Sequence, residues 1–234
     1  MEDSQQAWEE EYTKKRLMTG DKPAKSLVHF VKFLKKEYRA KGVGIEDMRV
    51  LDLGSGEGKN AIYLAGLGIQ VDCIEIARNA VATTQQKINQ GGLTSLVRVK
   101  QGSMGDTGAY EFPDEAFDII IDVTSSNSLS EAEREVYLEH SARVLKQGGY
   151  MFVRALCKDG DSNAKQLLKD HPGQEKDTYV MPGWGQTERV FTEYDIRELY
   201  EQYFTILTLE KETHYTNFNN KRFRRNFWVM YLQK

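Results

Sequence analysis

The chain has 234 residues and a formal net charge of −3, with 29% charged and 40% hydrophobic residues. This length suits one α/β domain with additions, and the apolar content argues against wholesale disorder. The slightly acidic balance does not favour nucleic-acid binding, and no apolar run approaches the ~18 residues of a membrane span. Because the chain has two cysteines, Cys73 and Cys157, and a polar amino terminus, we expect a reduced, cytoplasmic protein without a disulfide framework or a metal site.

The chain opens with a charged, amphipathic arm, residues 1–22, which carries Trp8 and Tyr12. Apolar side chains then recur at helical spacing from Leu27 to Tyr38, which predicts a first helix. Strands and helices alternate after it. The expected strands are 48–53, 70–74, 96–100, 117–123 and 150–154, and the expected helices are 60–67, one through 80–88, and 131–146. Such alternation predicts a parallel sheet with helical crossovers.

Residues 155–191 break this alternation, because they are rich in glycine and proline and only 164–168 looks regular. The expected elements after this insertion are a helix at 193–202 and strands near 204–210 and 225–232. A short polar loop joins these last two strands, so we expect them to pair antiparallel. The prediction is one domain over 1–234, with a doubly wound, seven-stranded, mostly parallel sheet and an antiparallel C-terminal hairpin.

The strongest chemical signal is the loop Gly54-Ser-Gly-Glu-Gly58, which follows a strand and opens a helix. Open α/β sheets bind ligands at this point, where glycines allow the backbone to approach closely. The third glycine of a dinucleotide fingerprint would fall at Lys59 instead of Gly58. Asp52 and Glu57 would also repel phosphate. The loop therefore favours a cationic ligand without phosphate, such as S-adenosylmethionine.

A second signal is Glu75, at the end of the next strand and 21 residues after Gly54. In nucleoside-binding α/β folds, a carboxylate at this place accepts both ribose hydroxyl hydrogens. The loop and Glu75 together predict a nucleoside site.

With these motifs the chain resembles the class I S-adenosylmethionine-dependent methyltransferases. The matching pieces are Val50-Leu-Asp-Leu-Gly-Ser-Gly-Glu-Gly58, Glu75, Phe117-Asp-Ile-Ile-Ile-Asp122 and Ala142-Arg-Val-Leu-Lys-Gln-Gly-Gly149. The run Glu57-Gly-Lys-Asn-Ala-Ile-Tyr-Leu-Ala65, with Trp8 and Tyr12, resembles the small-molecule branch that includes the tellurite-resistance and thiopurine methyltransferases. The resemblance implies a Rossmann-like methyltransferase fold, S-adenosylmethionine as cofactor with S-adenosylhomocysteine as product, and no metal.

The resemblance also implies roles for single residues. The glycine loop would hold the methionine moiety, Asp52 its amino group, Glu75 the ribose and Ile76 the adenine. Ser103 stands where an aspartate that meets the adenine amino group is commoner. The residues implied for the cofactor are Asp52, Gly54, Ser55, Gly56, Gly58, Glu75, Ile76, Ser103, Met104 and Asp122.

Asp122, at the end of a strand, is the candidate catalytic residue, and it could contact the acceptor or the methionine amino group. The alternative is that its carboxylate caps local backbone. The following Val-Thr-Ser-Ser-Asn127 is not the Pro-Pro-aromatic motif of DNA-adenine or glutamine N-methylation. A general base is needed only when the acceptor is protonated at working pH, and His171 and His214 are the histidines that could reach one.

Two further features allow two interpretations each. Trp184, in the insertion, could join the N-terminal arm as a lid, or it could pack locally. Arg222, Arg224 and Arg225 could form an RNA-binding strip or a charged edge that prevents aggregation.

The main hypothesis is a methyltransferase for a small-molecule acceptor. The alternatives are a protein or RNA methyltransferase that docks through the basic hairpin, and a non-catalytic S-adenosylmethionine-binding protein. The acceptor atom and the oligomeric state stay open.

Overall fold

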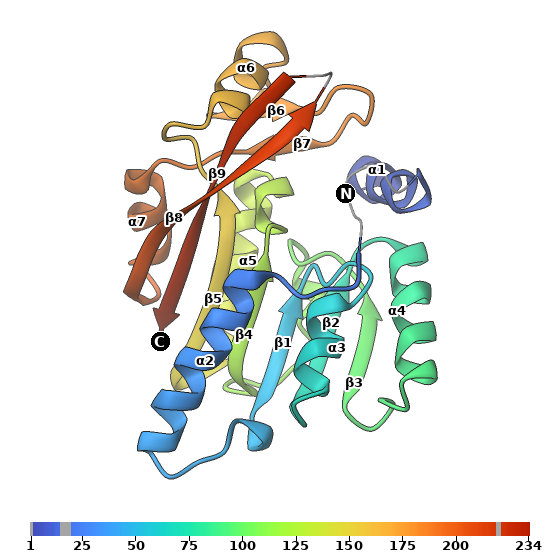
Figure 1. The fold of residues 1–234 in the computed structure, drawn as a ribbon, viewed down its shortest axis with the longest axis vertical. Helices are drawn as coiled ribbons and strands as arrows, with labels where there is room; N and C mark the ends of the chain where they lie inside the picture. The colour runs from blue at the N-terminus through green and yellow to red at the C-terminus, as the bar shows by residue number, and fades with distance from the viewer. Residues whose placement is uncertain (1, 15–19, 219–220) are drawn as a thin grey trace.

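The computed structural model describes residues 2–14, 20–218 and 221–234. Over these ranges the main sheet has seven strands in the order β3-β2-β1-β4-β5-β9-β8 (Figure 1). The strands are β1 (Arg49–Leu53), β2 (Gln70–Glu75), β3 (Val97–Gln101), β4 (Phe117–Val123), β5 (Leu145–Leu156), β8 (Thr205–Phe218) and β9 (Lys221–Gln233). The five strands from β3 to β5 run parallel, whereas β9 pairs antiparallel with both β5 and β8. The predicted fold class is confirmed.

The order of strands determines where a ligand can bind. The chain builds β1, β2 and β3 toward one edge, returns to place β4 beside β1, and continues to the other edge. The loops after β1 and β4 therefore leave the same edge of the sheet in opposite directions, which opens a crevice between them. The glycine loop follows β1, and Asp122 lies near the end of β4.

Helices cover both faces of this sheet (Figure 1). The helices are α1 (Glu2–Lys14), α2 (Lys25–Ala40), α3 (Lys59–Ala65), α4 (Arg78–Gln90), α5 (Glu131–Val144), α6 (Ser162–Asp170) and α7 (Glu193–Tyr200). Apolar side chains of α2, α3 and α4 join one buried cluster, and those of α5 and α7 join the cluster on the other face. No helix in the described ranges is both long and apolar enough to span a membrane.

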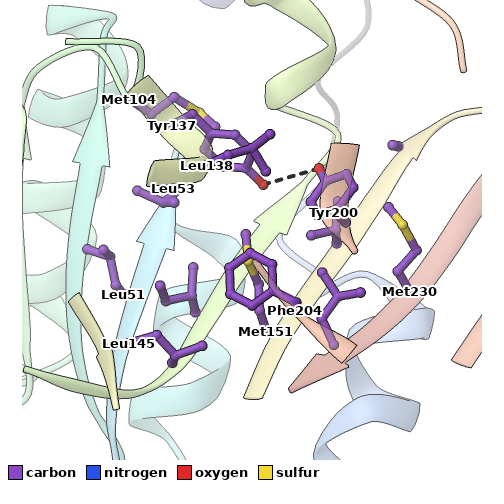
Figure 2. Packing of buried hydrophobic residues seen from close by; sticks show 14 of the residues in the cluster. Leu51, Leu53, Met104, Tyr137, Leu138, Leu145, Met151, Tyr200, Phe204 and Met230 are labelled. Atoms are coloured by element: carbon purple, nitrogen blue, oxygen red, sulfur yellow. Dashed lines mark hydrogen bonds between the residues drawn. The ribbon is translucent and has the colours of Figure 1, made fainter. Parts of the chain in front are cut away.

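The cluster under α5 and α7 supports the end of β4. Figure 2 shows Tyr137 of α5 and Tyr200 of α7 pointing toward one another, with their hydroxyl oxygens 3.5 Å apart. The Tyr137 hydroxyl also donates to Asp122 Oδ2 at 3.0 Å. Buried hydroxyls need such partners, because an unpaired polar group inside a core is costly. A hydrogen bond from the core therefore holds the Asp122 carboxylate in place.

Two sequence-based expectations need correction. The predicted helix 131–146 ends at Val144, because the buried Leu145 already pairs with Phe117 of β4 as the start of β5. The insertion 155–191 is also more regular than expected. It contains α6 and a two-stranded antiparallel sheet of β6 (Thr178–Val180) and β7 (Thr187–Arg189). In these pieces α6 packs against β9 and β6, and β7 packs against the turn at Ser126–Ser128.

Candidate functional site

The glycine loop adopts a conformation that other residues would strain. Gly54 and Gly56 have φ angles of 68° and 57°, in the left-handed region. A Cβ added at Gly54 would lie 2.4 Å from the side chain of Ser125, and one at Gly56 would lie 2.6 Å from the Tyr12 hydroxyl. The loop is therefore packed between the turn after β4 and the helix α1, and both positions need glycine.

Glu75 ties the end of β2 to this loop. Its Oε2 accepts the Gly56 N–H at 2.8 Å, and its Oε1 accepts the Ala77 N–H at 2.9 Å. Burial raises the pKa of the Glu75 carboxyl, while the two backbone hydrogen bonds act in the opposite direction. The carboxylate thus shapes the loop, and each oxygen keeps a lone pair that a ligand hydroxyl could use.

A cavity of about 690 Å³ lies above the loop. The predicted cofactor residues that line it are Gly54, Ser55, Gly56, Glu75, Ile76, Ser103 and Met104. Asp52, Gly58 and Asp122 are not among its lining residues. The structure therefore brings most of the predicted set onto one wall, which we call the cofactor wall, and keeps the two aspartates behind it.

Asp122 has the geometry of a backbone cap. Its Oδ1 accepts the N–H groups of Ser125 and Ser126, at 2.9 and 3.3 Å. Together with the hydroxyl of Tyr137, these donors occupy both oxygens. Burial raises the pKa of Asp122, and the hydrogen bonds oppose that shift. The cap fixes the turn after β4, and direct contact of Asp122 with a ligand stays a prediction.

Asp52 is buried on β1 and has fewer hydrogen-bond partners than Asp122. Its Oδ2 has no hydrogen-bond partner in the described part of the chain. Burial, together with the charges of Asp122 and Glu75, raises the pKa of Asp52 to about 8, and Lys59 opposes the shift. The loop is thus backed by an acidic group that holds its proton unusually strongly.

A second wall of the cavity consists of charged side chains that sequence reasoning mostly missed. This acceptor wall contains Arg154 of β5, Glu188 of β7, Glu212 and His214 of β8, and Arg225 of β9. Only a charged residue inside an otherwise apolar strand could have signalled Arg154. His214 was predicted as a histidine that could reach an acceptor, and it does line the cavity, whereas Arg225 was singled out as part of a basic strip. His171 is exposed at the end of α6 and does not line the cavity. Among the described residues, no group of three or more His, Cys, Asp or Glu could hold a metal ion.

Helix α1 and the insertion meet over the cavity. Trp8 packs edge-on against Trp184, with ring centroids 4.8 Å apart, and Trp184 Nε1 donates to the Ala7 carbonyl at 2.7 Å. The Ser4 hydroxyl donates to Gln186 Oε1 at 3.0 Å. Trp8 and Trp184 both line the cavity. The pairing of arm and insertion that the lid hypothesis requires is therefore present.

The basic tail divides between two environments. Arg224 is exposed, whereas the Arg225 side chain lines the cavity. The side chain of Arg222 lies outside the described part of the structure. The described part of the tail therefore does not place the arginines on one continuous exposed strip.

Comparison with known proteins gives a consistent result. Residues 50–149 match a family model described as a methyltransferase domain. The chain is 25% identical over 138 residues to a ribosomal protein L11 methyltransferase of Desulfitobacterium hafniense, covering 59% of this chain and 41% of that one. It is 32% identical over 113 residues to a sarcosine/dimethylglycine N-methyltransferase of Aphanothece halophytica, covering 47% and 39%. The chain thus spans about two fifths of the length of these relatives.

The solved structure of TehB from Haemophilus influenzae shares the fold. It superposes with a TM-score of 0.65 at 19% identity, over 97% of this chain and 67% of that one. The superposition extends the likeness beyond the matched segment to the insertion and the C-terminal hairpin. Residues 50–149 therefore match a methyltransferase domain, and the chain has the Rossmann-like methyltransferase fold over almost its whole length.

Proposed function

We propose that this chain transfers a methyl group from S-adenosylmethionine to a small-molecule acceptor. The observation that carries the proposal is the cofactor wall: a left-handed glycine loop, Glu75 bonded to it, and the Ile76 and Met104 side chains, all on one cavity. The matched methyltransferase family supports the reaction. TehB, associated with tellurite resistance, and the sarcosine/dimethylglycine N-methyltransferase support a small acceptor.

The residues present fit this cofactor. The cavity volume of about 690 Å³ lies within the range of small-molecule sites. Glu57 and Glu75 line it, and Asp52 Oδ2 is a buried oxygen without a partner. Acidic groups suit a ligand with sulfonium and ammonium charges and would repel a pyrophosphate. When bound, S-adenosylmethionine supplies a methyl group already activated by its positive sulfur.

The protein then has to position the acceptor, align it and exclude water. An in-line displacement on an activated carbon gains much of its acceleration from proximity and orientation. Thr124 and Ser125, in the turn after β4, line the same cavity and are bonded to Arg154 of the acceptor wall and to Gly54 of the glycine loop, so one cavity joins the two walls. Trp8 and Trp184 close the cavity from above and restrict the entry of water.

A protein acceptor is the second candidate, because the chain is similar to a ribosomal protein methyltransferase. The contacts of α1 with the insertion favour the small molecule, since they cover the cavity that a protein side chain would have to enter. A protein substrate would require α1 to move away. A binding protein without turnover is the remaining alternative.

The test is calorimetric titration with S-adenosylhomocysteine, with NADH as the control ligand. We expect saturable one-site binding of S-adenosylhomocysteine alone. Glu75→Ala should weaken it by about 1–3 kcal/mol, roughly 5- to 150-fold, because buried hydrogen bonds are lost. Glu75→Gln, which keeps one acceptor oxygen, should lose less, and Glu198→Ala on the exposed face of α7 should bind like wild type.

Binding of NADH alone would contradict the proposal. So would unchanged affinity in a folded Glu75→Ala variant, because Glu75 would then lie outside the cofactor site. If S-adenosylhomocysteine binds but a screen of small acids, amines, thiols and phenols gives no methyl transfer, the non-catalytic alternative gains.

A further inference from the structure

Arg154 is held in place on the acceptor wall by contacts around its guanidinium. Nε donates to Glu212 Oε2 at 2.8 Å, and Nη1 donates to Thr124 Oγ1 at 2.9 Å. The guanidinium carbon lies 3.5 Å from the centroid of the Phe227 ring. Within the described residues, the third nitrogen, Nη2, has no hydrogen-bond partner, and it is not one of the buried unpartnered atoms. One nitrogen of a rigidly oriented cation is therefore left for a ligand.

The backbone next to Arg154 is strained. Thr124 has a φ of 65°, which is rare for a β-branched residue. Its N–H donates to the Arg154 carbonyl at 2.7 Å, so main chain and side chain of the two residues are bonded to each other. The next residue, Ser125, donates its hydroxyl to the Gly54 carbonyl at 3.0 Å. Strain of this kind persists where the surroundings enforce it, typically at functional sites. Arg154 is thereby tied to the loop that would hold the cofactor.

A second guanidinium faces the same ring and the same cavity. The Arg225 guanidinium carbon lies 5.9 Å from the Phe227 centroid, and Nε is buried without a hydrogen-bond partner, 3.5 Å from Asp161 Oδ2. Burial lowers the pKa of Arg154, and the charge of Arg225 acts in the same direction, against that of Glu212. Two cations thus repel one another across an aromatic ring.

Carboxylates lie beside both guanidinium groups. Glu212 is shared, because His214 Nε2 lies 2.9 Å from its Oε1 while Arg154 donates to its Oε2. Glu188 accepts the Tyr179 hydroxyl at 2.8 Å; burial raises its pKa, and the charge of Arg225 opposes that shift. Arg154 and Arg225 therefore present positive charge to the cavity beside the carboxylates of Glu188 and Glu212.

We propose that Arg154 and Arg225 bind a carboxylate group of the methyl acceptor, whose apolar part packs against Phe227 and Trp184. This inference rests on the proposed function and names the acceptor class. Nη2 of Arg154 and the guanidinium of Arg225 can each donate an N–H to a carboxylate oxygen, and their charge is complementary to it. Leu156 and Met181 extend the apolar part of the lining. Because Glu188 and Glu212 border the same wall, a singly charged carboxylate suits it better than a phosphate dianion.

The experiment uses the full-length protein saturated with S-adenosylhomocysteine and two matched pairs of probes: phenylacetate with phenylacetamide, and butyrate with butyramide. Calorimetry should show that the acid of a pair binds roughly 10- to 100-fold more tightly than its amide, as expected for charge-assisted hydrogen bonds. Arg154→Gln should abolish this preference while S-adenosylhomocysteine still binds. Arg154→Lys, which keeps the charge but loses the planar guanidinium group, should retain part of the preference for the acid.

Arg197→Gln is the matched control, because Arg197 pairs with Glu193 and Glu201 on the exposed side of α7 and should leave the preference intact. The inference is overturned if neither acid binds more tightly than its amide, if the preference survives in Arg154→Gln, or if phenyl phosphate binds more tightly than phenylacetate. Failure of wild type to bind S-adenosylhomocysteine would instead overturn the proposed function itself, so the two failures are distinguishable.

Discussion

The two walls of the cavity are built in different ways. The cofactor wall is mostly backbone from one continuous stretch, shaped by Gly54 and Gly56 and fastened by Glu75. The acceptor wall is made of side chains from β5, β7, β8 and β9, held by ion pairs and by the Phe227 ring. A backbone site depends on a few local conformations, whereas a side-chain site depends on elements that are distant in sequence.

The same two walls differ in whether they lie inside the segment that matches the methyltransferase domain model. The matched family segment ends at residue 149, before any residue of the acceptor wall. Cofactor chemistry needs one constant geometry, so a common segment can supply it. Acceptor recognition has to differ between enzymes, and the residues that we propose for it lie on β5, in the insertion and on the C-terminal hairpin.

The largest expected effect comes from breaking the cofactor wall. Gly54→Ala adds a Cβ within 2.4 Å of Ser125 in a left-handed conformation, so the loop and the turn after β4 must separate. We expect S-adenosylhomocysteine affinity to fall by more than about 100-fold, since overpacking alone costs about 1–3 kcal/mol and the φ adds to it. Calorimetry measures the loss.

Gly92→Ala controls for backbone strain alone. Gly92 has a φ of 64°, and a Cβ there would meet nothing within 4 Å. This variant should lose some stability and keep its affinity for S-adenosylhomocysteine. If Gly54→Ala also bound normally, the close contact between loop and turn would not belong to the cofactor site.

The second expected effect is a change in how stability depends on pH, caused by Asp52. The pKa of Asp52 is raised from 3.8 to about 8 by burial and by the charges of Asp122 and Glu75. The folded state therefore holds this proton more tightly than the unfolded chain does. The resulting stability is present below pH ~4 and is lost as the pH rises toward ~8.

Asp52→Asn removes this titration. Its free energy of unfolding, relative to wild type, should therefore be higher at pH ~8 than at pH ~5, by on the order of 2 kcal/mol. Urea denaturation at both pH values measures it. Asp47→Asn, at an exposed position, should change with pH as wild type does. Equal differences for Asp52→Asn at both pH values would show that Asp52 titrates normally.

The smallest expected effect is on ligand dissociation and concerns Trp184, which lines the cavity together with Trp8. Trp184→Ala removes the edge contact with Trp8 and the hydrogen bond to the Ala7 carbonyl. Together these are worth about 1 kcal/mol, so S-adenosylhomocysteine should dissociate roughly fivefold faster in stopped-flow measurements. Tyr194→Ala, an exposed aromatic on α7, is the control. An unchanged rate would mean that ligands leave by another route.

Local patterns in the sequence determined the fold class and the position of the cofactor wall. The run 117–123 predicted a central strand, which the structure confirms as β4. The glycine loop and Glu75 could be identified because each is encoded locally. A strand, the tight turn after it and the end of the next strand each depend on neighbouring residues alone. Their predicted contacts with a bound cofactor remain for the titrations above.

Only the tertiary structure decided which charged residues share the cavity. Arg154 meets Glu212 across 58 positions of sequence, and Trp184 meets Ala7 across 177. For Asp122 the sequence left open a ligand contact or a cap on local backbone, and the structure shows the turn after β4 and Tyr137 donating to its oxygens. No local pattern encodes such contacts, because they depend on how β5, the insertion and the hairpin pack. The proposed acceptor site depends on that packing, whereas the glycine loop is encoded by neighbouring residues of the chain.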